Sequence, residues 1–413
     1  MKLLYVAHRF SPEPMGADRS LRQLIALRKL GYEVTVLTTF PSYPRGRVYP
    51  GYRGRLLFRE TLEGLGVVRV WSLTAPNSGF VLRAVSFISF LVSVSLVGLF
   101  LGRPAVVMAA IPSPGTELAG LLIARGKGSA LVLEMIDLLP DNLEFLDRKG
   151  GLILRLIERY YRFMYRKAVA VAVVSVSARD VLVERGVAKQ KILLLPNAAD
   201  PEVLDSGNCA DIRSAHGLES KFLVVYAGSF SRYYQVPNLV DAAEILMRMR
   251  PDIHFLLIGD GPEHDAVGKL LIQRSIRNVT LIGALPRSRI GGYLQAADLF
   301  LYSLVAHSIP RAYHNHISSK ACDYLFVGRP IIAVENGPVL GPLLTEIGAG
   351  VSVAPKKPFQ LAKTIAAFQD APDLRECSGS AGRSYARRWL IRQVTMSEFD
   401  RDLRVILNQE KAL

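Results

Sequence analysis

The segment LVVYAGSFS, from Leu223 to Ser231, joins the two local patterns that decide the fold of this chain. Its first five residues form an uninterrupted apolar run, as in a strand that is buried on both faces of a parallel sheet. Gly228 and Ser229 then form a turn of small residues, and a helix is expected to start near Pro237. Such a turn lets backbone N–H groups approach an anion, and the helix dipole favours a phosphate. Many βα turns contain glycine, so this segment alone does not identify a ligand.

Short runs rich in Val, Ile and Leu recur along the chain, and segments of helical periodicity separate them. This alternation is typical of parallel strands in doubly wound α/β folds. Residues 196–220 divide the runs into two series, because turn-forming residues are frequent there and no periodicity is sustained. Two series predict two Rossmann-like domains, with ligands at the carboxyl ends of the strands in an interdomain cleft. The expected strands are 3–7, 34–38, 67–71, 106–110, 131–135 and 171–174, then 223–227, 254–258, 280–282, 299–302, 331–334 and 351–353.

The length supports this division. A chain of 413 residues exceeds the roughly 250–300 residues at which single cores stop growing. We place an N-terminal domain at 1–198, a C-terminal domain at 199–384 and a final helical segment at 385–413, where Trp389 lies on a helical pattern.

Cysteine usage and the first residues favour a reducing compartment. The three cysteines lie far apart, without a CxxC pair or histidines at metal-ligand spacing, so neither a disulfide framework nor zinc is indicated. The apolar run that opens the chain lacks the basic start and long apolar core of a signal peptide, and we interpret it as a first buried strand. We therefore expect a cytosolic protein.

The charge distribution points to an anionic partner. The formal net charge is +15, and residues 1–200 hold about 27 basic against about 15 acidic side chains. Nucleic acid, anionic lipid and a lipid-linked pyrophosphate are all candidates. Nucleic acid is disfavoured because the basic residues accompany apolar surface and no recognised RNA- or DNA-binding module is present.

Two segments suggest where a membrane surface would bind. Residues 84–102 carry no charge and are long enough to span a bilayer. A span would place strands of one sheet on opposite sides of the membrane, so we expect a helix with one buried side and one side in the interface, or an ordinary buried crossover helix. Residues 160–167 alternate basic and aromatic side chains, as in an interfacial helix or in a solvated basic face.

An ordered set of motifs in both halves resembles the retaining glycosyltransferases of family GT4, which have the GT-B fold. Within that family the chain is most similar to the WbuB and colanic-acid-type enzymes of bacterial surface polysaccharide biosynthesis. The resemblance covers nearly the whole sequence, and the combination of motifs is specific although each motif is not. The motifs are GYEVTVL (31–37), PSYP (41–44), GY (51–52), DLLP (137–140), LPN (195–197), AGSFS (227–231), LIGDGP (257–262), SKACDYL (319–325) and GRP (328–330).

The resemblance implies an enzyme that moves a hexosyl unit from a nucleotide-diphosphate donor, with UDP favoured, to a lipid-linked or saccharide acceptor. It also implies retention at the anomeric carbon, a C-terminal domain that binds the donor, an N-terminal domain that binds the acceptor, and a final helix that returns to the N-terminal domain. The expected location is the inner face of the cytoplasmic membrane, with peripheral attachment. Two alternatives remain open: a non-catalytic sugar-nucleotide-binding scaffold on the membrane, and a sugar-nucleotide epimerase on the same fold.

The donor site departs from the family pattern. Asn315 and Asp323 stand where the family commonly has two glutamates; the shorter Asp323 can still accept a ribose hydroxyl, and Asn315 can orient the sugar without adding charge. Ser229 and Gln235 stand where Arg and Lys are common, so another group must stabilise the leaving diphosphate.

Lys320, near a helix start, and Arg232 are our candidates for that charge, although either can instead be a solvated side chain. The remaining expected donor contacts come from the turns and from the start of the same helix. They are Gly228, Gly259, Gly283, His316 and Ser319.

The first domain offers acceptor candidates. Asp137 follows a strand and is expected to face the cleft, where it would accept the proton of the acceptor hydroxyl or bind the donor sugar; it is otherwise an N-cap. His8, Arg9, Glu13 and Gly16 in the first βα loop are candidates for the acceptor phosphate. A basic loop is suited to a pyrophosphate or is a solvated surface loop; it carries Arg45, Arg47, Arg53 and Arg55 with Tyr49 and Tyr52.

Two absent motifs restrict the chemistry. No Asp-x-Asp triplet closes a strand, since the one at 400–402 falls in a polar helical segment, so we expect no essential metal and no cofactor beyond the nucleotide-sugar substrate. No Walker sequence occurs, which argues against ATP hydrolysis.

Overall fold

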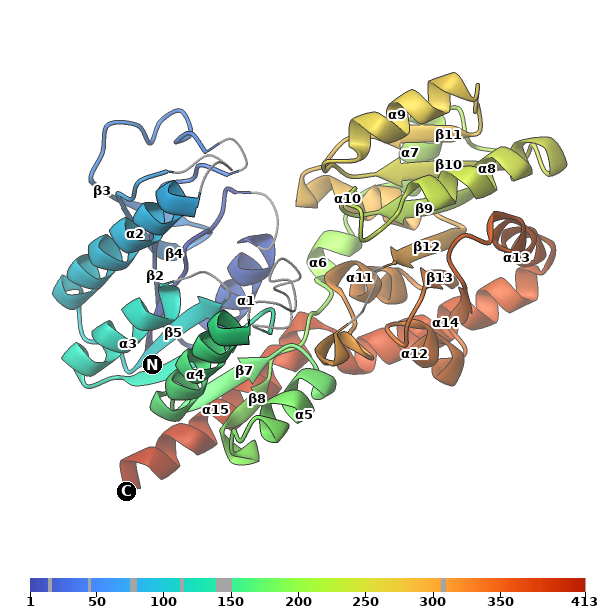
Figure 1. The fold of residues 1–413 in the computed structure, drawn as a ribbon. Helices are drawn as coiled ribbons and strands as arrows, with labels where there is room; N and C mark the ends of the chain where they lie inside the picture. Colours follow the sequence, from blue (N-terminus) through green and yellow to red (C-terminus); the bar gives the residue numbers. More distant parts are fainter. Residues whose placement is uncertain are drawn as a thin grey trace. The chain divides into compact units, whose positions relative to one another are not determined.

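The computed structural model describes residues 1–13, 17–43, 46–74, 80–111, 115–138, 151–305 and 310–412 (Figure 1). The chain divides into two compact units. Unit 1 comprises Met1–Pro196 with Thr395–Leu413, and unit 2 comprises Asn197–Val394. The unit boundaries therefore fall two residues before the first expected boundary and ten residues after the second.

Unit 1 is built on an eight-stranded sheet of order β3-β4-β2-β1-β5-β6-β7-β8, in which only the β3–β4 pair is antiparallel. The six expected strands are present. Two were not predicted: β3 is an edge strand with alternating exposure, and β8 has three residues. The strands are β1 (Lys2–Val6), β2 (Glu33–Thr39), β3 (Leu57–Leu62), β4 (Leu65–Val70), β5 (Val106–Ile111), β6 (Ala130–Met135), β7 (Ala170–Val173) and β8 (Ile192–Leu194).

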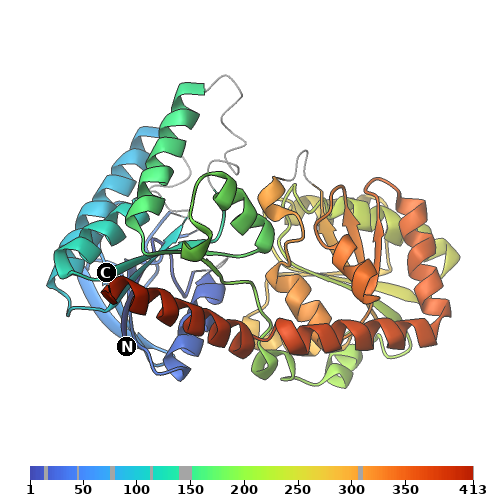
Figure 2. The same cartoon turned by 90° about the horizontal axis from the view of Figure 1, so that it is seen from below.

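Helices cover both faces of this sheet. On one face α1 (Ala17–Lys29) and α15 (Arg392–Ala412) bury Leu24, Phe399 and Leu403 against the strands. The final helix thus returns to the first unit, as the family resemblance implied. Figure 2 shows the helices α2, α3 and α4 on the opposite face. They span Phe80–Phe100, Thr116–Lys127 and Gly151–Lys167, and α5 (Val176–Glu184) with a 3-10 turn at Lys189–Lys191 connects β7 to β8.

Unit 2 is built on a six-stranded, fully parallel sheet of order β11-β10-β9-β12-β13-β14. All six strands of the expected second series are present. They are β9 (Phe222–Ala227), β10 (Ile253–Ile258), β11 (Val279–Ile282), β12 (Leu299–Leu304), β13 (Ile331–Glu335) and β14 (Gly350–Val353).

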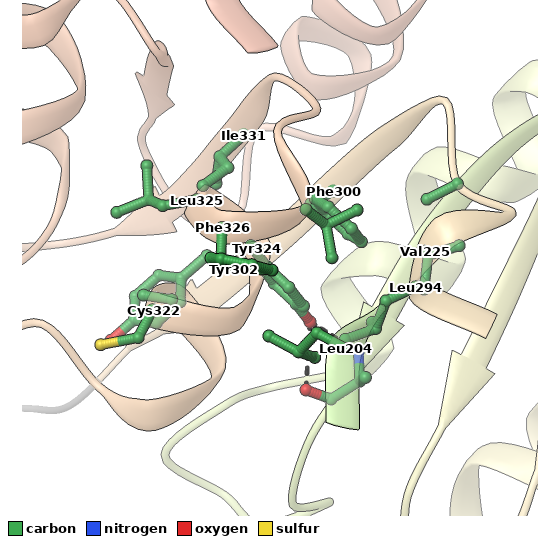
Figure 3. Close-up of a cluster of buried hydrophobic side chains, with 14 of the residues drawn as sticks. Leu204, Val225, Leu294, Phe300, Tyr302, Cys322, Tyr324, Leu325, Phe326 and Ile331 are labelled. Carbon is green, nitrogen blue, oxygen red and sulfur yellow. Dashed lines mark hydrogen bonds between the residues drawn. The ribbon is translucent and has the colours of Figure 1, made fainter. Parts of the chain in front are cut away.

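Apolar clusters fill both faces of the second sheet. Figure 3 shows one of them, where the ring of Tyr324 stacks on Phe300 with centroids 4.2 Å apart and the Tyr324 hydroxyl bonds to the backbone of Ala227. This contact fixes the end of β9. The helices are α6 (Pro201–Leu204), α7 (Cys209–Ala215), α8 (Pro237–Met249), α9 (His264–Gln273), α10 (Arg287–Gln295), α11 (Ser319–Val327), α12 (Gly341–Ile347), α13 (Pro358–Asp370) and α14 (Pro372–Trp389), with a 3-10 turn at Arg311–Tyr313.

Residues 196–220, where the sequence sustains no periodicity, belong to unit 2 from Asn197 onward. Two short helices, α6 and α7, lie there and pack on α10 within unit 2. A Cβ at Gly207 would lie 2.9 Å from the backbone nitrogen of Gly292, so this glycine permits a close backbone contact. Helices of four and seven residues are too short to show a helical period in the sequence.

The strand orders define where each sheet can bind a ligand. In unit 1 the order reverses between β1 and β5, and in unit 2 it reverses between β9 and β12. Loops that leave neighbouring strands in opposite directions open a crevice at the carboxyl ends of those strands. The Gly228 turn follows β9 and therefore lies at the crevice of unit 2.

Candidate functional site

The Gly228 turn is held by backbone contacts with the neighbouring βα turn. The Gly228 N–H donates to Ile258 O and the Phe230 N–H donates to Asp260 O, both at 2.9 Å. Within the described part of the chain the Ser229 N–H has no hydrogen-bond partner. The turn therefore leaves one backbone amide available for an anion.

Gly259, expected in the donor site, is required by this close approach. Its φ is +145°, and a Cβ there would lie 1.8 Å from the carbonyl oxygen of Gly228. Any side chain at Gly259 would displace the turn. Gly283, also expected in the donor site, lies exposed after β11, and a Cβ there would meet no atom within 4 Å. The structure therefore gives a packing reason for the first glycine and none for the second.

Lys320 lies beneath the same turn. A Cβ at Gly228 would be 3.1 Å from the Lys320 Nζ, so the two predicted site residues converge. The stem of Lys320 is partly exposed, but its Nζ is inaccessible to solvent and has no hydrogen-bond partner in the described structure. The alternative of a solvated lysine is therefore wrong.

Three tyrosine rings surround this Nζ. The ring centroids of Tyr234, Tyr226 and Tyr302 lie 3.6, 4.9 and 5.1 Å from it, and we call these residues the tyrosine cage. The rings attract a cation through their electron-rich faces. Burial alone lowers the pKa of Lys320 to about 7. The sequence analysis did not predict the cage, which also positions the turn: the Tyr226 hydroxyl donates to Ser229 O at 2.7 Å.

The residues between the Gly228 turn and α8 form a loop that caps the start of this helix. Gln235 has φ +39°, and its backbone oxygen accepts the N–H of Asn238 at 2.9 Å. The Leu239 N–H donates to Val236 O, so these first-turn amides of α8 are already used. Arg232 is exposed, with its guanidinium 5.2 Å from the Tyr233 ring centroid. The loop before α8 therefore partly caps the N-terminus of this helix, whose dipole was expected to favour a phosphate.

A second group of expected donor residues gathers before α11. The Ser319 hydroxyl donates to the Asn197 side-chain oxygen at 3.2 Å, and the Asn197 amide donates to Ile317 O at 3.0 Å. The His316 Nε2 lies 3.5 Å from the same amide nitrogen. Asn315 is exposed at φ +53°, and its N–H donates to a neighbouring loop carbonyl at 2.8 Å. Asn197, which the sequence analysis did not list as a site residue, organises this group.

Asp323 forms an ion pair that the sequence analysis did not predict. We expected its carboxylate to accept a ribose hydroxyl, but both oxygens accept from the guanidinium of Arg287, at 2.5 and 2.8 Å. Burial raises the pKa of Asp323, and Arg287 opposes this shift. Arg287 also lies 3.8 Å from Asp200, which in turn pairs with Arg392. The ion pair uses one acceptor site on each oxygen of Asp323, and the contact with a ribose hydroxyl stays a prediction.

In unit 1 the expected acceptor residues surround the loop after β1. His8 is half-buried, with its ring centroid 4.7 Å from that of Phe90, and burial together with the charge of Arg9 lowers its pKa to about 4. A neutral imidazole at pH 7 can hydrogen-bond a phosphate but adds no charge. Arg9 is exposed, with its guanidinium 4.1 Å from the Tyr43 ring centroid.

Glu13 is buried, and one of its carboxylate oxygens accepts the N–H groups of Ser42 and Tyr43 at 2.7 and 2.8 Å. It therefore ties the first βα loop to the loop after β2. Gly16 lies outside the described residues. Asp137 is half-buried two residues beyond the end of β6, the carboxyl end at which a ligand is expected.

The basic loop before β3 is a surface feature. Arg47, Arg53 and Arg55 are exposed, and Arg55 stacks on the Phe58 ring at 4.1 Å. The Tyr52 hydroxyl donates to Glu60, and Arg45 lies outside the described residues. The arginines of this loop are therefore accessible to an anion.

Helix α2 has one buried side and one exposed apolar side. Phe90 and Val94 are fully buried, whereas Ile88 and Leu96 are 60% and 54% exposed. A Cβ at Gly98 would lie 2.3 Å from the Ile123 side chain, so the buried side packs closely on α3. The exposed apolar residues recur at helical spacing along one side; they are Leu82, Val85, Ile88, Val92, Leu96, Leu99 and Phe100.

Helix α4 combines exposed apolar and basic side chains. Tyr161, Met164 and Tyr165 are buried, whereas Leu152 and Leu156 are 66% and 57% exposed. The exposed side also carries Arg155, Arg159, Arg162, Phe163, Arg166 and Lys167. We call the exposed apolar side of α2 together with this side of α4 the apolar-basic face. Searched over the described residues, the chain has no helix that qualifies as a membrane span.

Comparisons with known proteins agree with this architecture. Residues 16–198 match the family described as "Glycosyl transferase 4-like domain", and residues 210–385 match "Glycosyl transferases group 1". WcaI of Escherichia coli, named as a colanic acid biosynthesis glycosyl transferase, is 25% identical over 98% of this chain and 100% of its own length.

Two solved structures share the fold. The sucrose-phosphate synthase of Thermosynechococcus elongatus superposes with a TM-score of 0.73 at 17% identity, over 99% of both chains. HepE of Anabaena, in complex with UDP-glucose, superposes with a TM-score of 0.70 at 16% identity, over 98% of this chain and 100% of HepE. The two family matches together with the two nucleotide-fold units identify the chain as a GT4-like, group 1 glycosyltransferase of the GT-B fold.

Proposed function

We propose that this glycosyltransferase moves a sugar from a nucleotide diphosphate, with UDP as the favoured nucleotide, to a lipid-linked pyrophosphate acceptor in the synthesis of a bacterial surface polysaccharide. The name of WcaI supports the polysaccharide, and the UDP-glucose complex of HepE supports the donor. Transfer with retention follows the resemblance to GT4 enzymes. The proposal places the protein at the inner face of the cytoplasmic membrane.

The observation that carries the proposal is the convergence of the Gly228 turn and Lys320 at the crevice of unit 2. In the reaction the acceptor oxygen forms a bond to the anomeric carbon, and the bond from that carbon to the diphosphate breaks. Negative charge then develops on the diphosphate. A free amide at Ser229 and a cation behind the turn would stabilise this charge more strongly as the bond breaks, which raises the rate.

The remaining residues take supporting roles in this proposal. Asn315, His316 and Ser319 would contact the donor sugar, and Asp137 would accept the proton that the acceptor hydroxyl loses. His8 and Arg9 would bind the acceptor phosphate, the former as a neutral hydrogen-bonding group. No step in this scheme requires a metal ion.

The apolar-basic face supports the lipid acceptor and the membrane. An interfacial helix buries apolar side chains at the level of the lipid headgroups while its basic residues attract anionic lipid. The exposed apolar side of α2 and the arginines of α4 supply both contributions. The two helices lie on one face of the first sheet (Figures 1 and 2). Binding at this face would bring unit 1 to a lipid-anchored acceptor.

The experiment is a transfer assay with radiolabelled nucleotide sugars, purified protein and bacterial membrane lipid extract. We expect label to move into the lipid fraction from one donor. A folded protein that transfers no label from any UDP- or GDP-sugar would contradict the proposal. Binding of a donor without transfer, and without hydrolysis when acceptor is omitted, would instead identify a non-catalytic scaffold; conversion of the donor to its epimer would identify an epimerase.

A further inference from the structure

Lys320 is an unusual cation because its Nζ forms no ion pair within the described part of the chain. The Nζ is inaccessible to solvent and has no hydrogen-bond partner among the described residues. The tyrosine cage surrounds it, and a Cβ added at Gly228 would lie 3.1 Å from it. An ammonium group in such a place loses its hydration, and the aromatic faces replace only part of it.

The elements that pack around the Nζ supply only neutral groups. Tyr226 comes from β9, Tyr302 comes from β12 and Tyr234 comes from the loop before α8, and burial raises the pKa of Tyr226 and of Tyr302. Two carboxylates also raise the pKa of cage tyrosines, Glu263 that of Tyr226 and Glu335 that of Tyr302. Neither contributes to the pKa of Lys320, which burial alone lowers to about 7. The amine is therefore close to its titration point at neutral pH.

A ligand anion bound on the other side of the turn would favour the charged form of the Lys320 amine. Gly228 lies between the Nζ and the crevice, and a Cβ on this glycine would be 3.1 Å from the Nζ. A diphosphate on the Ser229 amide would bring negative charge to a site from which water is excluded, where charges interact strongly. The Tyr226 hydroxyl holds Ser229 O at 2.7 Å while its ring contacts the cation, so turn and cation are fixed together.

We propose that Lys320 and the tyrosine cage couple the binding of a nucleotide diphosphate at the Gly228 turn to the uptake of one proton by the Lys320 amine. This inference rests on the proposed function, because it requires a diphosphate at this turn. The proton comes from solvent and stays on the Nζ while the diphosphate is bound. The leaving diphosphate is then stabilised by a fully charged Lys320 ammonium group. In the empty site the same amine is only partly charged.

The test is isothermal titration of the whole chain with UDP at pH 8 in buffers of different ionisation enthalpy. The slope of the observed enthalpy against the buffer enthalpy gives the protons taken up. We expect close to one proton for the wild-type protein and close to none for Lys320→Arg, which is always charged, and for Lys320→Met, which cannot be charged. Circular dichroism of each variant checks that it is folded.

A second measurement needs no variant. The affinity of the wild-type protein for UDP should weaken about tenfold for each pH unit above the pKa of the empty site, because the bound state holds one more proton than the free state. UDP that binds without proton uptake, or a Lys320→Arg protein that takes up the same proton, would overturn this inference and leave the proposed function intact. A wild-type protein that binds neither UDP nor GDP would overturn both.

Discussion

The tyrosine cage of unit 2 and the apolar-basic face of unit 1 place positive charge in opposite environments, one buried and one exposed. In the cage a single ammonium group is removed from water and faces aromatic rings. On α4 the basic residues are exposed beside leucine and phenylalanine side chains. A buried charge interacts strongly with a nearby anion, whereas exposed charges are screened by salt and act in sum. The first arrangement suits one defined phosphate group, and the second suits an extended anionic surface.

This difference predicts how each region responds to substitution. In unit 2 a single substitution should cause a large loss of binding or turnover, because the turn, the cation and the rings occupy fixed positions. In unit 1 each basic residue should contribute a small, similar amount.

Gly259→Ala should have the largest effect. The new Cβ would lie 1.8 Å from the Gly228 oxygen at a φ of +145°, so the turn must move. We expect a loss of roughly 3 kcal/mol in the free energy of unfolding and no detectable UDP binding by calorimetry. Gly268→Ala is the control, because a Cβ there meets only ordinary contact at 3.5 Å. Retained UDP affinity in Gly259→Ala would show that the turn does not bind the diphosphate.

Lys320→Met should separate activity from stability. Loss of the cation behind the turn should lower kcat by a factor on the order of 10². Thermal unfolding should occur at the same or a higher temperature, because an amine without a hydrogen-bond partner is no longer buried. Lys363→Met on α13, which removes an exposed cation 4.8 Å from the Phe359 ring centroid, is the matched control. Equal turnover in the two variants would remove Lys320 from the site.

Neutralising the basic side of α4 should weaken membrane binding. The triple substitution Arg159→Gln, Arg162→Gln and Arg166→Gln removes about 1 kcal/mol per residue, which is roughly a hundredfold in vesicle affinity. Sedimentation with vesicles of phosphatidylglycerol and phosphatidylcholine measures this change. A matched triple in unit 2 replaces three exposed arginines with glutamine: Arg248, Arg277 and Arg289. If both triples bind vesicles equally, the attraction is a property of net charge and the face on α4 has no special role.

Chelation of divalent metal should have the smallest effect. If Lys320 and the Ser229 amide stabilise the diphosphate, removal of divalent metal by excess EDTA should leave the transfer rate unchanged. The control is the same assay with added Mg²⁺. A rate that falls with EDTA and recovers with Mg²⁺ would contradict the prediction of a metal-independent enzyme.

Most of the fold could be predicted because it depends on local patterns. Ten of the twelve expected strands are mostly buried in a parallel sheet, so the sequence carries an apolar run for each of them. The edge strands β11 and β14 are only partly buried, but they too lie in short apolar runs. The edge strand β3 escaped prediction because its alternate residues are exposed, including Arg59. The helices α6 and α7 escaped because they are too short to repeat.

Only those site residues that lie directly at a strand end or a helix start could be predicted from the sequence. The pairing of Gly228 with Lys320 followed from motifs that each lie at a strand or helix end. The tyrosine cage did not, because Tyr226, Tyr234 and Tyr302 come from three segments that only the folded sheet brings together. For the same reason the ion pair between Arg287 and Asp323, which lie 36 residues apart, could not be predicted.

The most direct test of this account is a crystal structure of the protein soaked with UDP. We expect the diphosphate against the Gly228–Ser229 turn, with an oxygen within hydrogen-bond distance of the Ser229 N–H and the Lys320 Nζ directly behind it. UDP bound elsewhere on unit 2, with this turn vacant, would contradict the assignment of the donor site.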